Sequence, residues 1–386
     1  MSSPCICIFS ALYPPSMGGV EAYTENLAQT LAEAGYRIIV VTLATHGSRG
    51  TAVENGIEVV RLPCRGCLNN RYPVAQKNSR YRALWSHLQN ERIDYVIVNT
   101  RFYLHSLEGL AFARAKGIAP ILIEHGSAHL TTGSPLVDAG VKLVEHAVTR
   151  AGRRYAASYY AVSRKSSAWL SHFGIASQGE LPNAISADGY VSNASKRDFR
   201  SEFGLPNDTF AVAFVGRLVG EKGVLELAQA VAEWSSAQSI ALFVAGDGPL
   251  LETLRTQASS QLHLLGKLSS EDIAALLMQV DALCLPSRSE GFATTLLEAA
   301  ACSTPIIVTD VGGVDELIPD ENFGTVILDK TPETIRRALE RAVENRQQLR
   351  SQGQNVGRRV RSECSWEKTA EHAVEACRRA QERRGL

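Results

Sequence analysis

Two glutamates, Glu290 and Glu298, are the residues whose type and spacing most strongly suggest chemistry. They stand in the stretch 286–300, PSRSEGFATTLLEAA, which follows an apolar run at 280–285. This run predicts a buried strand, and the residues from Thr294 onward predict a helix. Glu290 is therefore expected in the loop between the strand and the helix, and Glu298 within the helix.

A loop that enters a helix in this way is suited to a ligand that carries phosphate. The first N–H groups of a helix have no partner within it, and the helix dipole places positive charge at that end. Carboxylates at this place would repel phosphate, but an ionised carboxylate accepts hydrogen bonds from sugar hydroxyls. Glu290, Glu298 and the helix start together predict a nucleotide-sugar ligand.

Two cations, Arg217 and Lys222, flank a glycine-containing loop that follows the apolar run 209–215. Positive side chains between a strand end and a helix start can stabilise both charges of a leaving nucleoside diphosphate. The alternative is a pair of surface cations, because most Arg and Lys side chains lie on protein surfaces.

The segment 286–318, PSRSEGFATTLLEAAACSTPIIVTDVGGVDELI, resembles the signature of the retaining glycosyltransferases of family 4, also called glycosyl transferases group 1. The resemblance covers nearly the whole chain and is strongest over 211–318. It implies an α/β fold of the GT-B type, in which two Rossmann-like domains face each other across a cleft. One position departs from the family pattern. Ala293 stands where glycine is common, and its methyl group would narrow the sugar pocket.

The resemblance also implies roles for individual residues. Glu290 would contact the donor sugar and Glu298 the ribose, while Arg217 and Lys222 would clamp the diphosphate. The backbone around Leu268 would contact the nucleobase. Four further positions between Glu290 and the helix start are predicted to bind the donor: Gly291, Phe292, Ala293 and Thr294.

The N-terminal half carries candidate residues at predicted strand ends, where ligands bind in open α/β sheets. Gly19, in the GGVE segment after the first strand, is implied by the resemblance to lie against the donor diphosphate. A flexible turn is the plain alternative, because glycine accepts many backbone conformations. Asn99, Arg101 and His129 are predicted on the acceptor side.

His125, in the EHG segment, resembles the family histidine that approaches the donor sugar and the β-phosphate. The alternative is an ordinary loop histidine that is hydrogen-bonded to backbone. With the role that the resemblance implies, the predicted catalytic residues are His125, Arg217, Lys222 and Glu290.

Apolar runs alternate with amphipathic segments along the chain, which is typical of parallel sheets covered by helices. We expect an N-terminal, acceptor-side domain over 1–185 and a C-terminal, nucleotide-sugar-binding domain over 186–365. The Pro- and Gly-bracketed segment 181–190, LPNAISADGY, resembles the family's connection between the domains. The residues leave open whether the helix expected over 366–386 rejoins the first domain.

The composition excludes several classes of protein. The 386 residues include 40 Lys and Arg and 40 Asp and Glu, so no nucleic-acid partner is predicted. No apolar run approaches the about 20 residues of a membrane span. The eight cysteines, without a recognisable leader, predict reduced thiols in the cytoplasm. Cys64 and Cys67 form a single C-x-x-C pair in a predicted loop, without the second pair that zinc sites usually have.

The resemblance implies a retaining, hexosyltransferase-like enzyme. It would move a sugar from a UDP- or GDP-linked donor to a hydroxyl of a glycan or lipid-linked acceptor, in the synthesis of cell-envelope polysaccharide or glycolipid. No cofactor or metal is expected, because no Asp-x-Asp cluster is evident. Two alternatives stay open: a nucleotide-sugar epimerase or hydrolase of the same fold, and a non-catalytic nucleotide-sugar-binding subunit.

The basic stretch 142–154 lies in a helix-like segment with several apolar side chains. Such a helix is either the solvated face of a packed helix or a peripheral contact with an anionic membrane. The second interpretation would place the protein at the inner face of the membrane. The oligomeric state is left open.

Overall fold

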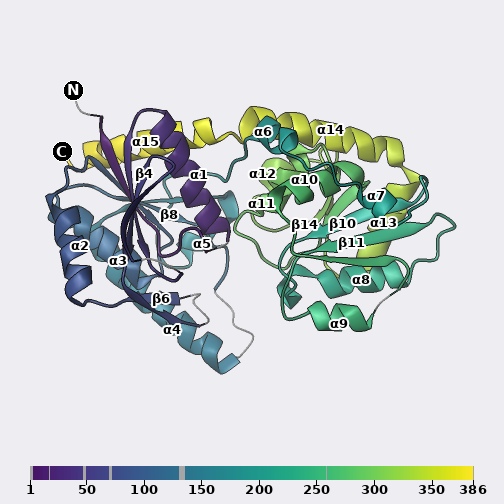
Figure 1. Ribbon diagram of the computed structural model, residues 1–386, viewed down its shortest axis with the longest axis horizontal. Helices are drawn as coiled ribbons and strands as arrows, with labels where there is room; N and C mark the ends of the chain where they lie inside the picture. Colours follow the sequence, from purple (N-terminus) through teal and green to yellow (C-terminus); the bar gives the residue numbers. More distant parts are fainter. Residues whose placement is uncertain are drawn as a thin grey trace. The chain divides into compact units, whose positions relative to one another are not determined.

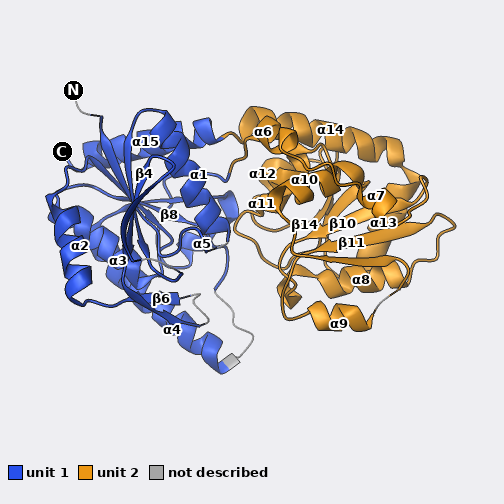
Figure 2. Ribbon diagram, in the orientation of Figure 1, with its two compact units in different colours: residues 1–183, 366–386 blue, residues 184–365 orange. Residues whose placement is uncertain are grey.

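The computed structural model describes residues 3–16, 18–46, 49–68, 72–129, 135–257 and 259–385. The chain forms two compact units. Unit 1 comprises residues 1–183 with 366–386, and unit 2 comprises residues 184–365 (Figure 2). Each unit is built on one largely parallel sheet with helices on its faces (Figure 1). The predicted α/β fold with two Rossmann-like sheets is confirmed.

Unit 1 contains a seven-stranded sheet with the order β3-β4-β2-β1-β7-β8-β9. Without β3, which is an antiparallel edge strand, this is the doubly wound order 3-2-1-4-5-6, and its switch point lies between β1 and β7. The strands are β1 (Cys5–Phe9), β2 (Arg37–Leu43), β3 (Gly50–Glu54), β4 (Ile57–Leu62), β7 (Tyr95–Asn99), β8 (Ile121–Glu124) and β9 (Ser158–Ala161).

The helices of unit 1 are α1 (Gly19–Glu33), α2 (Ser79–Asn90), α3 (Leu104–Ala115), α4 (Pro135–Gly152), α5 (Arg164–Ser171) and α15 (Trp366–Arg383), with a short 3-10 turn η1 (Arg153–Tyr155). The C-terminal helix α15 belongs to unit 1 and packs on α1, where the Tyr23 and Trp366 rings meet edge to face at 5.4 Å. Its Gln381 donates a hydrogen bond to the Asp94 carbonyl at 2.6 Å, just before β7. The C-terminal helix α15 therefore stabilises the sheet of unit 1.

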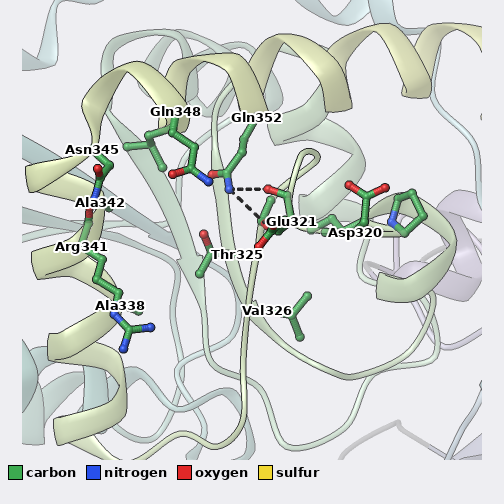
Figure 3. Close-up of a pocket in the computed structure, with 14 residues that line it drawn as sticks. Asp320, Glu321, Thr325, Val326, Ala338, Arg341, Ala342, Asn345, Gln348 and Gln352 are labelled. Carbon is green, nitrogen blue, oxygen red and sulfur yellow. Dashed lines mark hydrogen bonds between the residues drawn. The ribbon is translucent and has the colours of Figure 1, made fainter.

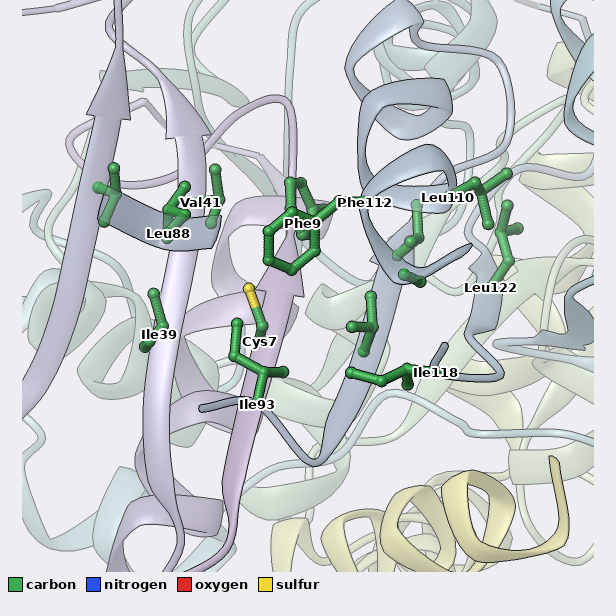
Figure 4. Close-up of a cluster of buried hydrophobic side chains, with 14 of the residues drawn as sticks. Cys7, Phe9, Ile39, Val41, Leu88, Ile93, Leu110, Phe112, Ile118 and Leu122 are labelled. Carbon is green, nitrogen blue, oxygen red and sulfur yellow. The ribbon is translucent and has the colours of Figure 1, made fainter. Parts of the chain in front are cut away.

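An apolar cluster fills one side of the unit 1 sheet (Figure 4). The rings of Phe9 on β1 and Phe112 on α3 lie 5.4 Å apart, and neither side chain is more than 2% exposed. Burial of a side chain of this size contributes about 1.5–3 kcal/mol. A Cβ at Gly109 would lie 2.6 Å from the Phe9 ring, so only glycine lets α3 approach β1 this closely. This packing fixes the end of β1, which precedes Gly19, and the end of β7, where Asn99 is the last residue.

Unit 2 repeats the same plan with six parallel strands in the order β12-β11-β10-β13-β14-β15. This is again the order 3-2-1-4-5-6, with the switch point between β10 and β13. The strands are β10 (Phe210–Val215), β11 (Ile240–Ala245), β12 (Leu262–Gly266), β13 (Ala282–Leu285), β14 (Ile306–Thr309) and β15 (Thr325–Ile327). Residues on β10, β11, β13 and β14 are buried throughout, as expected for strands that are covered on both faces.

The helices of unit 2 are α6 (Ala187–Ser192), α7 (Phe199–Glu202), α8 (Val224–Ala232), α9 (Leu251–Thr256), α10 (Ser270–Gln279), α11 (Thr294–Ala301), α12 (Val314–Leu317), α13 (Pro332–Glu344) and α14 (Arg346–Glu363), with a 3-10 turn η2 (Gly220–Lys222). Ser269 caps α10 by accepting a hydrogen bond from the Asp272 N–H, and Thr331 caps α13 by accepting one from the Thr334 N–H. None of the helices built from described residues has the length and apolarity needed to cross a membrane.

The prediction of a loop at Cys64–Cys67 was wrong. These residues form β5, which pairs with β6 (Tyr72–Ala75) as a two-stranded antiparallel sheet, and both cysteines are free thiols. The sequence does not indicate this strand, because three of its four residues are exposed and the segment shows no apolar alternation.

Candidate functional site

The switch point of unit 2 brings Lys222 and Glu290 together. Lys222 ends η2 after β10, and Glu290 lies in the loop after β13, the strand that neighbours β10. The Lys222 ammonium forms an ion pair with Glu290 Oε1, and the Ser287 hydroxyl donates to the same oxygen at 2.8 Å. The Lys222 and Glu290 side chains are 18% and 11% exposed, so the pair is mostly buried but reachable from solvent. Two residues 68 positions apart thus form one charged centre.

Backbone contacts hold the two loops against each other. The Arg288 N–H donates to the Glu221 carbonyl at 2.7 Å. Gly223 has φ +71°, and a Cβ there would lie 2.2 Å from the Pro286 carbonyl oxygen. Gly223 is therefore required both by its backbone conformation and by the close approach of the second loop. The Thr309 hydroxyl, at the end of β14, donates to the Ser287 carbonyl and ties in a third strand end.

Arg217 lies directly after β10 and is exposed. Its side chain makes no hydrogen bond or ion pair with another residue in the described part of the chain. Its carbonyl accepts a hydrogen bond from the Val219 N–H at 3.0 Å, which closes a tight turn after Gly216. A cation held on a short turn beside the Lys222–Glu290 loops, without a carboxylate of its own, is available to an anionic ligand.

The predicted helix start is present, since α11 begins at Thr294 and its N-cap residue, Ala293, provides no side-chain hydrogen bond. Gly312 and Gly313, which follow β14, pack against the loop that precedes α11. A Cβ at Gly312 would lie 2.8 Å from the Gly291 carbonyl oxygen, and one at Gly313 would lie 2.2 Å from the Phe292 ring. The two glycines therefore let the loop pack closely against them. Because Ala293 provides no cap, the first N–H groups of α11 are left to be satisfied from outside the helix.

Glu298 lies in the second turn of α11 and is half-buried. Burial raises the pKa of its carboxyl group to about 7. No cation among the described residues pairs with Glu298, so the energetic cost of its charge is not offset by the protein. Leu268, predicted near the nucleobase, is half-buried in the turn between β12 and α10.

His125 follows β8 and is held by side chains, not by backbone. Its Nε2 lies 3.1 Å from Asn99 Oδ1, and its ring meets Tyr23 edge to face at 4.7 Å. The Asn99 amide group donates to the Thr24 hydroxyl at 2.8 Å, and that hydroxyl donates to the Val20 carbonyl. Asn99 Oδ1 is thus an acceptor, which places the His125 proton on Nε2 and leaves Nδ1 as an acceptor.

Burial lowers the pKa of His125 to about 3, so the imidazole is neutral at physiological pH. Its Nδ1 has no hydrogen-bond partner in the described part of the chain. A neutral imidazole with an open acceptor nitrogen can receive a hydroxyl proton but cannot act as a cation.

Gly19 is the first residue of α1 and lies at the unit 1 switch point, after β1. A Cβ at this position would meet nothing within 4 Å, so no contact within the described chain requires glycine here.

The three residues predicted on the acceptor side lie in different surroundings. Asn99 is 1% exposed and supports His125. Arg101 is 2% exposed and is held by the Glu124 and Glu145 carboxylates and the Thr149 hydroxyl. His129 is half-buried and bonds Glu145, a buried acid that no sequence motif singled out.

A hollow of about 500 Å³ in unit 2 lies elsewhere (Figure 3). It is lined by residues between 318 and 352, and Gln352 bridges it by donating to the Glu321 carbonyl at 2.7 Å. None of the predicted donor-binding residues lines it, and its charged side chains Asp320 and Arg341 are exposed. We therefore base the functional site on the strand ends and not on this hollow.

Sequence models of two families match the chain side by side. The family described as "Glycosyltransferase Family 4" matches residues 17–186, and "Glycosyl transferases group 1" matches residues 195–359. Among curated proteins, one component of the human phosphatidylinositol N-acetylglucosaminyltransferase is 24% identical over 345 residues, which cover 88% of this chain and 68% of that protein.

Solved structures match over almost the full chain. Sucrose-phosphate synthase from Thermosynechococcus elongatus aligns with a TM-score of 0.75 at 19% identity, covering 97% of this chain and 98% of that one. An Anabaena protein in complex with UDP-glucose aligns with a TM-score of 0.72 at 18% identity, covering 96% and 98%. At these identities the structures show the GT-B fold. Together with the two family matches, they show that this chain belongs to the family 4 (group 1) glycosyltransferases and is a retaining enzyme that uses a nucleotide-sugar donor.

Proposed function

We propose that the protein transfers a sugar from a UDP-linked donor to a hydroxyl of a lipid-linked or glycan acceptor. The observation that carries this proposal is the cation pair at the unit 2 switch point: Arg217, whose side chain pairs with no other described residue, and Lys222 beside Glu290. The UDP-glucose complex of the Anabaena protein favours UDP over GDP as the donor nucleotide. The human relative, whose name includes phosphatidylinositol, favours a lipid acceptor.

In the proposed reaction, the bond between the anomeric carbon and the β-phosphate oxygen breaks while the acceptor oxygen bonds to the same face of that carbon. The acceptor proton passes to the departing phosphate oxygen, and the nucleoside diphosphate leaves. Arg217, Lys222 and the first N–H groups of α11 offset the negative charge that grows on the phosphate. Such preorganised charge is often the largest single contribution to catalysis. Because the two cations and the α11 N–H groups offset the diphosphate charge, the reaction is proposed to need no metal.

Glu290 is proposed to orient the donor sugar through hydroxyl hydrogen bonds. Lys222 and Ser287 both bind its Oε1, so they hold the carboxylate in one orientation. Glu298, in the second turn of α11, is proposed to bind the ribose. Four residues between them, together with the turn at Leu268, complete the donor contacts that we propose: Gly291, Phe292, Ala293 and Thr294.

Two residues of unit 1 are proposed to act on the donor as well. His125 presents Nδ1 as an acceptor, which suits a hydroxyl of the donor sugar, and its neutral state avoids a competing ion pair with phosphate. Gly19 leaves the start of α1 open, so that backbone N–H groups can approach the diphosphate.

The surface of α4 supports a lipid acceptor at a membrane. Four apolar side chains are exposed on it, with fractions from 41% to 88%: Leu136, Val137, Leu143 and Val144. The exposed cations Lys142 and Arg150 lie on the same helix. An amphipathic helix with exposed apolar and basic side chains favours peripheral binding to an anionic membrane. We propose that the enzyme works at the inner membrane face.

The decisive experiment for this function is the release of UDP from UDP-sugars with and without acceptor lipids. Transfer predicts that UDP appears in proportion to a new glycolipid and that omission of the acceptor lowers its rate by at least about tenfold, as closed sites exclude water. UDP release that is independent of every acceptor would indicate a hydrolase. Interconversion of the sugar without UDP release would indicate an epimerase.

We predict that donor affinity rises with pH through the titration of Glu298. Below pH 7 this carboxyl group carries a proton in the free folded protein, because burial raises its pKa to about 7. Ribose hydroxyls are bound best by the ionised form, so at pH 5.5 the Kd for UDP-glucose should be about 30-fold higher than at pH 8. Calorimetric titration across this range tests the prediction, and Glu298→Gln should bind more weakly with no pH dependence. An unchanged pH profile in this variant would exclude Glu298 as its origin.

A further inference from the structure

Three histidine side chains converge in unit 1, apart from the residues assigned to the donor. His129 lies in the segment after β8, His146 lies on α4 and His172 lies directly after α5. Their nearest ring nitrogens all lie within 4.8 Å of one another. The three positions are well separated in the sequence, so the fold and not local spacing brings them together.

His129 is oriented by a buried carboxylate. Its Nδ1 lies 2.6 Å from Glu145 Oε2, and Glu145 is only 3% exposed. An ionised carboxylate accepts the proton of Nδ1, which leaves Nε2 of the neutral ring as a lone-pair donor. A carboxylate that holds the far nitrogen of a histidine in this way is the usual outer partner of a metal-bound imidazole.

A cluster of buried ion pairs lies beside this histidine. Arg101 carries one positive charge and contacts two carboxylates, Glu124 and Glu145, and all three side chains are at most 3% exposed. These ion pairs hold the Glu145 carboxylate in place, and with it the Nδ1 side of the His129 ring.

Aromatic side chains pack against the histidine cluster. The Trp169 and His172 rings stack at 4.8 Å with an interplanar angle of 4°, and the Phe173 ring lies 4.8 Å from His146. These contacts restrict the ring orientations, while His146 and His172 remain exposed and can shift. For a tetrahedral zinc ion with N–Zn bonds of about 2.0–2.1 Å, the nitrogens need to approach to about 3.3 Å, a movement of roughly 1 Å for each side chain.

We propose that His129, His146 and His172 form a binding site for a transition-metal dication, with Zn²⁺ as the best fit. Three imidazoles suit Zn²⁺, Co²⁺, Ni²⁺ or Cu²⁺, whereas Mg²⁺ and Ca²⁺ prefer oxygen ligands. Three protein ligands leave a fourth position for water or an anion. The ion would link α4 and α5 to the segment after β8, and all its ligands belong to unit 1. The site is independent of the proposed diphosphate site in unit 2.

The test is titration of the chelator-treated full-length protein with Zn²⁺ and, as a spectroscopic probe, with Co²⁺. We expect one ion per chain, visible Co²⁺ bands of a low-coordinate nitrogen site, and a rise in Tm with added Zn²⁺. His146→Ala and His172→Ala should each weaken binding about 100-fold, as loss of a metal ligand or its support does. Both side chains are exposed, so these variants should keep the metal-free Tm of the wild type.

His372→Ala is the matched control, because His372 is an exposed histidine on α15 outside the cluster. It should bind Zn²⁺ as the wild type does. The proposal would be overturned by the absence of binding at millimolar Zn²⁺ or by equal affinity in all three variants. A sulfur-to-cobalt charge-transfer band would also overturn it, because such a band assigns the ion to thiolates such as Cys64 and Cys67.

Discussion

Replacing Lys222 by alanine is expected to lower kcat for sugar transfer about 100- to 1000-fold. This is the range observed when one preorganised charge partner of a developing anion is removed. The side chain is held near the switch point by its ion pair with Glu290, so the ammonium is positioned before the donor binds. Its loss removes one of the two cations proposed to stabilise the departing diphosphate. It also loosens Glu290, which keeps the hydrogen bond from Ser287 and its other contacts but loses the ammonium.

The matched control for this prediction is Lys330→Ala. Lys330 also forms a partly buried ion pair in unit 2, with Glu226, at side-chain exposures of 21% and 29%, and it donates to the Gly220 carbonyl in the same turn as Lys222. Both variants should lose a similar, small amount of stability, about 1 kcal/mol or less, as partly exposed ion pairs do. Steady-state kinetics with UDP-sugar and acceptor should separate them, since only Lys222→Ala should lose activity strongly. Equal effects of both variants would mean that Lys222 acts only through loop structure.

The sheets were predicted well from the sequence, because strands covered on both faces are continuous apolar runs. Glu290 and Glu298 were also placed correctly in the loop and helix that follow β13. The Lys222–Glu290 ion pair was not predicted, because a contact across 68 residues depends on strand order and not on spacing. The 3-2-1-4-5-6 order places β10 beside β13.

Unit 1 contains more features that the sequence did not predict. The edge strand β3 was not predicted, because most of its side chains are exposed and carry no burial pattern. Arg101 was predicted to face an acceptor but is buried between two carboxylates, which sequence reasoning had assigned no role. The convergence of His129, His146 and His172 was also beyond prediction, since each follows or lies on a different element.

Replacing Arg217 by alanine is expected to raise the Kd for the donor about 10- to 100-fold without changing stability. A hydrogen bond to a charged group is worth about 1.5–3 kcal/mol, which corresponds to this range. Arg217 is exposed and has no side-chain partner in the described part of the chain, so a purely structural role predicts no effect at all. Arg337→Ala is the control, because Arg337 is an exposed arginine of unit 2 with a surface ion pair to Glu333.

Calorimetric titration tests whether the unit 2 switch point binds a nucleoside diphosphate sugar. UDP-glucose, GDP-glucose and free UDP should be titrated into the wild type, Arg217→Ala and Arg337→Ala under identical conditions. We expect saturable binding of one nucleotide class to the wild type and to Arg337→Ala, with a Kd about 10- to 100-fold higher for Arg217→Ala. Equal affinity in all three proteins would contradict it, because the diphosphate would then bind elsewhere.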